Sequence, residues 1–147
     1  MARSEQDIPE KSIFTTEITV RVSDLNYGGH VGNDTMLTLM QEARVQFYRE
    51  LGFKNEISFD GTVGQIITDA TVQYKSEAFL GDVLLIRIAV AGYNKYGFDM
   101  YYIIENKLTE KKVALGKTGI VCFDYEKRKI ATVPAVLLDK LKALTGD

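Results

Sequence analysis

The chain has 147 residues, of which 46% are apolar and 26% are charged, and its net charge is -2. This length fits a single domain, residues 1–147, with a sizeable core. No basic stretch stands out, which argues against nucleic acid as the main partner because phosphate binding needs clustered Lys and Arg. The N-terminus has no apolar core typical of a signal peptide, and no run approaches the ~18 apolar residues of a membrane span. We therefore expect a cytoplasmic protein with no membrane partner.

The first predicted elements are a strand and a long helix. After a loose arm over residues 1–11, apolar and polar residues alternate from Phe14 to Val22, which indicates a strand. Apolar residues then recur at helical spacing from about Thr35 to Leu51. Asn33 or Asp34 is the expected N-cap, and Gly52 should follow the last turn. The apolar stripe is broad enough for the helix to be largely covered: Met36, Met40, Ala43, Phe47 and Leu51, widened by Leu37, Leu39 and Tyr48.

Strand patterns dominate the rest of the chain, after a loop over residues 54–61. The predicted strands are Thr62–Tyr74, Val83–Ala91, Phe98–Leu108 and Val113–Tyr125, with turns at Gly81-Asp82, residues 92–97 and residues 109–112. Pro134 fits the first position of a short C-terminal helix. One long helix followed by strands without intervening helices predicts an α+β fold, in which an antiparallel sheet of about five strands wraps around one long central helix.

The single cysteine, Cys122, excludes an intramolecular disulfide and any multi-cysteine zinc site. It lies in the apolar stretch GIVCFDY. A buried strand cysteine that behaves as a small hydrophobe is favoured over a thiol nucleophile.

The segment from Asp24 to Asp34, DLNYGGHVGND, is the strongest candidate for chemistry. It contains the only histidine, His30, and it gathers carboxylates, amides and glycines where a strand pattern stops and a helix pattern starts. A loop of this composition brings backbone N–H groups to a helix N-terminus, where a developing negative charge is stabilised.

This order of elements and this loop resemble the hotdog-fold acyl-CoA thioesterases of the 4-hydroxybenzoyl-CoA thioesterase superfamily. The family's loop reads roughly D-x-D-x-x-G-H-V-N-N-x-x-Y, and the helix after it contains E-A-R. The resemblance spans about Ile13 to Val133. It implies a hotdog fold that hydrolyses an acyl-CoA or acyl-carrier-protein thioester to a free acid and a thiol, with no metal or cofactor. The matching residues are Asp24, Gly29, His30, Val31, Asn33, Glu42, Ala43 and Arg44, together with Gly81-Asp82 before the long strand.

Three positions depart from the family pattern. Asn26 stands where one large branch has its catalytic Asp, Gly32 replaces the first of the paired asparagines, and Met36 replaces the aromatic residue. An amide has no accessible pKa, so Asn26 cannot act as a base. It can hydrogen-bond a thioester carbonyl or position a water, and another residue must then supply the base.

Three residues are candidates for that base. Asp24 either activates water or supports the loop by accepting backbone N–H groups, as Asp often does in turns. His30 has a reference pKa of about 6.5, which suits neutral pH, and its alternative role is to order the loop. Glu42 lies on the helix, where other hotdog branches place a catalytic carboxylate. Alternatively it pairs with Arg44, Arg49 or a backbone group.

The resemblance places the oxyanion donor at Asn33, and Asn33 at an N-cap or N1 position lies beside free backbone N–H groups. Gly29 and Val31 complete the predicted substrate-binding part of the loop.

Two other functions fit the same residues. A 3-hydroxyacyl thioester dehydratase or hydratase would combine His30 with Glu42. A non-catalytic acyl-thioester-binding module would explain Asn26 as a mark of lost activity.

Two features of the predicted sheet indicate an oligomer. The strand Val83–Ala91 has apolar residues on both faces, and a single sheet leaves its edges uncovered. We expect a homodimer with a sheet continuous across the subunits, and a tetramer as a further step.

Overall fold

One antiparallel sheet forms the framework of the fold, in the strand order β1-β3-β4-β5-β2, with the short β6 beside β5. The computed structural model describes residues 8–146, so most of the predicted N-terminal arm (residues 1–7) lies outside the described residues. The strands are β1 (Phe14–Thr19), β2 (Val63–Tyr74), β3 (Val83–Ala91), β4 (Gly97–Asn106), β5 (Lys112–Asp124) and β6 (Lys129–Ile130). The helices are α1 (Asn33–Glu50) and α2 (Ala135–Thr145), with a short 3-10 turn, η1 (Val22–Asp24), before α1. This arrangement confirms the predicted α+β fold.

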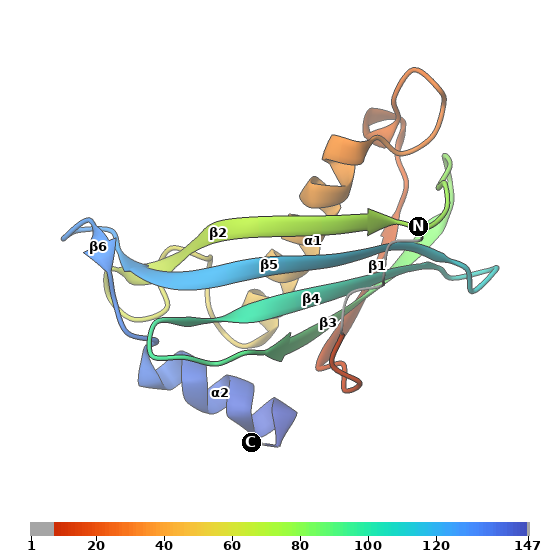
Figure 1. Cartoon of the computed structure of the whole chain (residues 1–147). Helices are drawn as coiled ribbons and strands as arrows, with labels where there is room; N and C mark the ends of the chain where they lie inside the picture. Colours follow the sequence, from red (N-terminus) through yellow and green to blue (C-terminus); the bar gives the residue numbers. More distant parts are fainter. Residues whose placement is uncertain (1–7, 147) are drawn as a thin grey trace, which may run out of the picture.

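The long helix α1 packs its apolar stripe against one face of the sheet, and Figure 1 shows it lying behind the strands. Met40 lies so close to β5 that a Cβ at Gly116 would come within 2.6 Å of the Met40 Cε atom. A glycine in the strand therefore permits the close approach of helix and sheet. The buried residues of α1 are Met36, Leu39, Met40, Ala43, Arg44, Phe47 and Tyr48.

The ends of α1 differ slightly from the prediction. Its N-cap is Gly32, so Asn33 is the first helical residue rather than the cap. At the other end, Gly52 follows the C-cap with a φ of +100°, as predicted, because glycine adopts this left-handed conformation without a Cβ clash. The prediction that Leu37 widens the covered stripe is wrong, since this side chain is 44% exposed.

Three further details correct the sequence prediction. The first strand ends at Thr19, and Val22 is 72% exposed because the chain turns into η1 there. Pro134 is the N-cap of α2 and not its first residue. The pair of residues in β6 was not predicted, because two residues carry no periodicity.

Cys122 is fully buried in β5, as predicted. Burial raises the pKa of its thiol to about 11. The thiolate is the nucleophilic form of cysteine, so this residue is inert near neutral pH.

The two edges of the sheet are β1 and β2. The middle of β2, residues 67–71, is exposed along its free edge. The strand with apolar residues on both faces, β3, lies between β1 and β4 and so is not an edge strand. None of the described helices is long and apolar enough to cross a membrane.

Candidate active site

The loop before α1 folds into a tight hairpin of its own. Asn26 N–H donates to the His30 carbonyl at 2.9 Å, and Gly29 N–H donates to the Asn26 carbonyl at 3.1 Å. Gly29 has a φ of +78°, a conformation that a side chain would strain. The turn brings Leu25 and Val31 opposite each other as a β-bridge. The loop therefore has a defined backbone conformation.

The segment that follows β2 fixes this loop to the sheet. Val31 N–H donates to the Ala78 carbonyl at 2.8 Å, and His30 forms a β-bridge with Phe79. The Tyr74 hydroxyl donates to the carbonyl of Asn33 at 3.0 Å, which ties the first turn of α1 to the end of β2. In Figure 1 the loop, the start of α1 and the end of β2 meet at one end of the molecule.

A cavity of about 220 Å³ opens where these three segments meet. The loop and helix contribute one wall and the segment after β2 contributes the other. We call it the His30 pocket. Its lining residues are His30, Val31, Asn33, Met36, Tyr74, Lys75, Ser76, Glu77 and Ala78.

His30 lies between a backbone carbonyl and a carboxylate. Its Nδ1 atom is 3.2 Å from the Val31 carbonyl oxygen, and its Nε2 atom is 3.9 Å from Oε1 of Glu77. The His30 side chain is 30% exposed. Sequence reasoning missed Glu77, because it lies 47 residues beyond His30 and no local pattern marks it. The bridge between His30 and Phe79 and the hydrogen bond from Val31 N–H to the Ala78 carbonyl bring it near the loop.

Asn26 belongs to a different cavity. Its Oδ1 atom accepts a hydrogen bond from Gly28 N–H at 2.9 Å, and its side chain is exposed. A cavity of about 400 Å³ borders it, lined by Ser23, Leu25, Asn26, Tyr27, Gly32, Asp34 and Thr35. This second cavity shares no lining residue with the His30 pocket. The predicted site residues Asn26 and His30 thus line different cavities, although both side chains approach Gly28, where a Cβ would lie 3.4 Å from Asn26 Oδ1 and 3.1 Å from His30 Nε2.

Asp24, the last residue of η1, is buried, with 3% of its surface exposed. Its carboxylate accepts hydrogen bonds from Arg21 N–H at 2.9 Å and from the Arg21 guanidinium at 3.2 Å. Burial alone would raise the pKa of Asp24, but the hydrogen bonds and charge of Arg21 outweigh it, and the pKa lies below its usual range. The Asp24 carbonyl also accepts from Gly32 N–H at 3.3 Å, just before α1.

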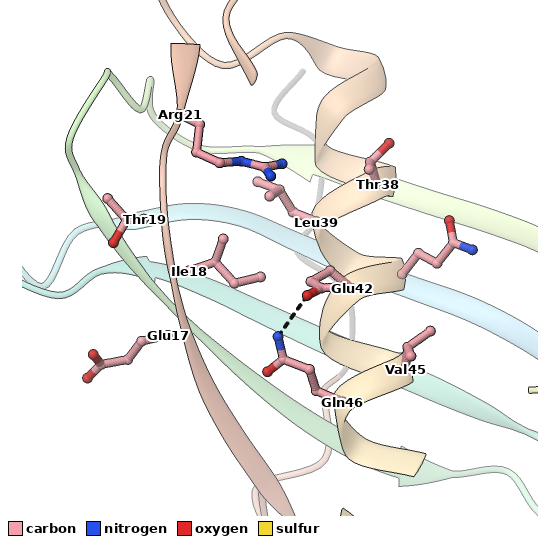
Figure 2. Close-up of a pocket in the computed structure, with 10 residues that line it drawn as sticks. Glu17, Ile18, Thr19, Arg21, Thr38, Leu39, Glu42, Val45 and Gln46 are labelled. Carbon is pink, nitrogen blue, oxygen red and sulfur yellow. Dashed lines mark hydrogen bonds between the residues drawn. The ribbon is translucent and has the colours of Figure 1, made fainter. Parts of the chain in front are cut away.

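Glu42 faces neither of these two cavities. It lies on the exposed side of α1 and borders a groove of about 520 Å³ between α1 and β1. Figure 2 shows its carboxylate accepting a hydrogen bond from the Gln46 side chain, at 3.0 Å. The predicted pairing with Arg44 is wrong, because Arg44 is buried and pairs with Glu56. The chain therefore does not bring Glu42 and His30 to one pocket.

Asn33 opens the helix beside the His30 pocket. The first N–H groups of an α-helix have no partner within the helix, and the helix dipole adds positive potential there. Thr35 and Met36 N–H already donate to the Gly32 carbonyl. The N–H groups of Asn33 and Asp34 precede these at the start of the helix, and Asn33 is the one of the two residues that lines the His30 pocket. Gly29 shapes the loop turn, while Val31 is buried and forms part of the pocket wall.

Comparison with known proteins shows what this architecture is similar to. A model of the thioesterase-like superfamily matches residues 20–141. The structure is similar to Slr0204, a 1,4-dihydroxy-2-naphthoyl-CoA thioesterase from Synechocystis, at 24% identity and a TM-score of 0.81, covering 90% of this chain and 97% of that one. It is also similar to the gentisyl-coenzyme A thioesterase BH1999, at 21% identity and a TM-score of 0.77, covering 87% and 99%.

A third similar structure is that of the probable thioesterase YbaW from Escherichia coli, at 21% identity and a TM-score of 0.70, covering 88% of this chain and 97% of that one. A search of curated proteins finds no match to the chain. The solved structures share the hotdog fold with this chain, as the sequence resemblance implied.

Proposed function

We propose that this chain, which belongs to the thioesterase-like superfamily, hydrolyses an acyl-CoA thioester to a free acid and a thiol. The observation that carries the proposal is that His30 and Asn33, the first residue of α1, line one small cavity between the loop and the segment after β2. An imidazole and a helix N-terminus therefore lie beside the same space. That combination suits a reaction in which a carbonyl oxygen gains negative charge and a water loses a proton.

In the proposed reaction, the thioester carbonyl lies at the first turn of α1. The N–H groups of Asn33 and Asp34 would receive the oxygen as it becomes negative. A loss of one such donor typically costs about 100-fold or more in rate. Asn26, which lines a different cavity, would act through the conformation of the loop or through a second contact with the substrate.

The names of the similar structures guide the choice of substrates. Slr0204 is a 1,4-dihydroxy-2-naphthoyl-CoA thioesterase and BH1999 a gentisyl-CoA thioesterase, and both names denote CoA thioesters of hydroxylated aromatic acids. A substrate panel for this chain should therefore include aromatic acyl-CoA thioesters beside straight-chain ones and an acyl-carrier-protein thioester.

For assembly, we propose a homodimer that joins two β2 edges into one continuous sheet. β2 is an edge strand of 12 residues with an exposed middle, and an exposed edge strand is a template for pairing with another chain. The end of the same strand carries Tyr74, which borders the His30 pocket, so a dimer through β2 would place a partner chain beside the site. Light scattering at micromolar concentration should give the mass of two chains or four, and the mass of one chain would contradict this assembly.

The activity test measures thiol release from the panel with a thiol reagent. Cys122 is buried and contributes little background in the folded protein. Release of CoA at a rate well above the uncatalysed one supports the proposal. A change in crotonyl-thioester absorbance without thiol release would instead identify a hydratase. Saturable binding without turnover would identify a binding module.

A further inference from the structure

We propose that Glu77 is a catalytic residue of this site and that it holds the attacking water together with His30. The inference rests on the proposed thioester hydrolysis and names the base that reaction requires. The family carboxylate is missing at Asn26, and Glu77 supplies one from a different segment of the chain.

The distance between the two side chains points to a shared water. Nε2 of His30 and Oε1 of Glu77 are 3.9 Å apart, which is too long for a direct hydrogen bond and suited to one bridging water. The Nδ1 contact with the Val31 carbonyl assigns the ring proton of neutral His30 to Nδ1. Nε2 then faces the carboxylate as a second acceptor. A water between them donates one O–H group to each, which leaves its lone pairs free to attack.

The backbone holds Glu77 in this position. The residue after it, Ala78, is buried and accepts the hydrogen bond from Val31 N–H. Phe79 forms the bridge with His30, and its own N–H donates to the Asp82 carboxylate at 2.9 Å. Glu77 therefore lies on a segment that is paired with the loop and anchored at the next turn, although its side chain is 63% exposed.

The other candidate carboxylates are occupied or lie elsewhere. Asp24 is engaged by Arg21, Asp34 borders the cavity of Asn26, and Glu42 borders the groove beside β1. Among the residues that line the His30 pocket in the described part of the chain, Glu77 is the one carboxylate. It shares that lining with Asn33, whose N–H group would receive the oxyanion.

The proposed step conserves atoms and charge. The water oxygen forms a bond to the carbonyl carbon while Glu77 takes one of its protons, and the carbonyl oxygen becomes negative at the N–H groups of Asn33 and Asp34. When the carbonyl re-forms, the carbon–sulfur bond breaks. The departing thiolate takes the proton from the Glu77 carboxyl group, which leaves a free acid, a thiol and an ionised Glu77.

The test compares Glu77→Gln with a matched control, Glu50→Gln, on an acyl-CoA that the wild type hydrolyses. Glu50 is exposed at the far end of α1, outside the site. General-base catalysis contributes about 100- to 10,000-fold, so Glu77→Gln should lower kcat by about 100-fold or more with KM little changed. Glu77→Asp, which keeps the carboxylate one methylene shorter, should recover part of that loss, and the control should match the wild type.

The outcomes separate the two proposals. An active wild type whose Glu77→Gln variant keeps its kcat would overturn the assignment of Glu77 and leave the proposed function standing. A wild type that releases no thiol from any member of the panel would overturn both. Because Glu77 is exposed, thermal unfolding of its variants should coincide with that of the wild type.

Discussion

Polar groups near the two ends of α1 lie in opposite surroundings. At its N-terminal end, His30 and Glu77 are partly exposed and approach no closer than 3.9 Å. In its C-terminal half, Arg44 is 5% exposed and lies among polar groups that bond to one another directly. The contrast teaches how to distinguish the roles of polar residues in this fold: buried and mutually bonded groups serve stability, while groups with room between them can hold a substrate or water.

The buried group joins three parts of the structure. Arg44 pairs with Glu56 of the loop before β2 and donates from Nη1 to the Tyr102 hydroxyl of β4 at 3.0 Å. The Tyr102 and Thr118 hydroxyls lie 2.8 Å apart, which extends the contacts to β5. Burial alone would lower the pKa of Arg44, but Tyr102 and Glu56 hold it above its usual value. Arg44 therefore remains charged inside the core.

The largest expected effect concerns this buried group. Arg44→Met leaves Glu56 without its partner and removes one of the two hydrogen bonds of the Tyr102 hydroxyl, and breaking a buried ion pair from one side costs about 3–5 kcal/mol of unfolding free energy. Urea or guanidinium unfolding measures the loss. Arg49→Met, on the exposed surface of the same helix, should change stability by no more than about 0.5 kcal/mol. If the two variants were equally stable, the buried contacts of Arg44 would contribute no more to stability than the exposed side chain of Arg49.

The next effect concerns the loop. Asn26→Ala removes the side-chain acceptor of Gly28 N–H and should lower kcat on a thioester by about 100-fold, the scale for a misplacement of about 1 Å in a site, with the unfolding temperature nearly unchanged. Asn26→Asp restores the carboxylate of the family pattern and should retain or raise activity. An Asn26→Ala enzyme with unaltered kcat/KM would show that Asn26 takes no part in the reaction and that the His30 pocket alone is the site.

The smallest effect concerns acid stability. The folded state lowers the pKa of Asp24, so in acid the unfolded chain binds more protons at this residue than the folded chain does. The stabilisation by ionised Asp24 is complete above its unfolded pKa of about 3.9 and is lost as the pH falls through the lower folded value. Asp24→Asn should cost about 1 kcal/mol at neutral pH, because Arg21 is largely exposed.

The pH dependence of unfolding tests whether ionised Asp24 stabilises the fold. The free energy of unfolding, measured between pH 5 and pH 2, should fall more steeply for the wild type than for Asp24→Asn. If it fell equally in both, the contacts with Arg21 would not favour the ionised form of Asp24.

Most of the fold could be predicted from periodicity alone. The strand Val83–Ala91 has the predicted bounds, because it is a short apolar run rich in β-branched residues between the Gly81-Asp82 turn and Gly92. Val22 continues the apolar–polar alternation that begins at Phe14 and is nevertheless exposed, because hydrogen bonds from Arg21 to Asp24 turn the chain at that point. The contact between Arg21 and Asp24 ends the strand there, and the alternation of apolar and polar residues does not reveal it.

The site could be predicted only in part. The loop that joins a strand to the helix could be identified from its composition, but composition did not show that Asn26 and His30 line different cavities. Glu77 could not be found, because its proximity to His30 comes from pairing between two segments far apart in the chain. Glu42 lies at a helical position that faces β1, so matching the family motif did not establish that it shares a pocket with His30.

The central claim is that His30 and Glu77 act on one water at the N-terminal end of α1. A double-mutant cycle in kcat/KM tests it, with the wild type, His30→Gln, Glu77→Gln and the double variant measured on one acyl-CoA. Residues that act as a unit give losses that do not multiply, so we expect each single variant to lose about 100-fold or more and the double variant to be scarcely slower than either. Losses that multiply, or a His30→Gln enzyme that keeps its full rate, would contradict the claim.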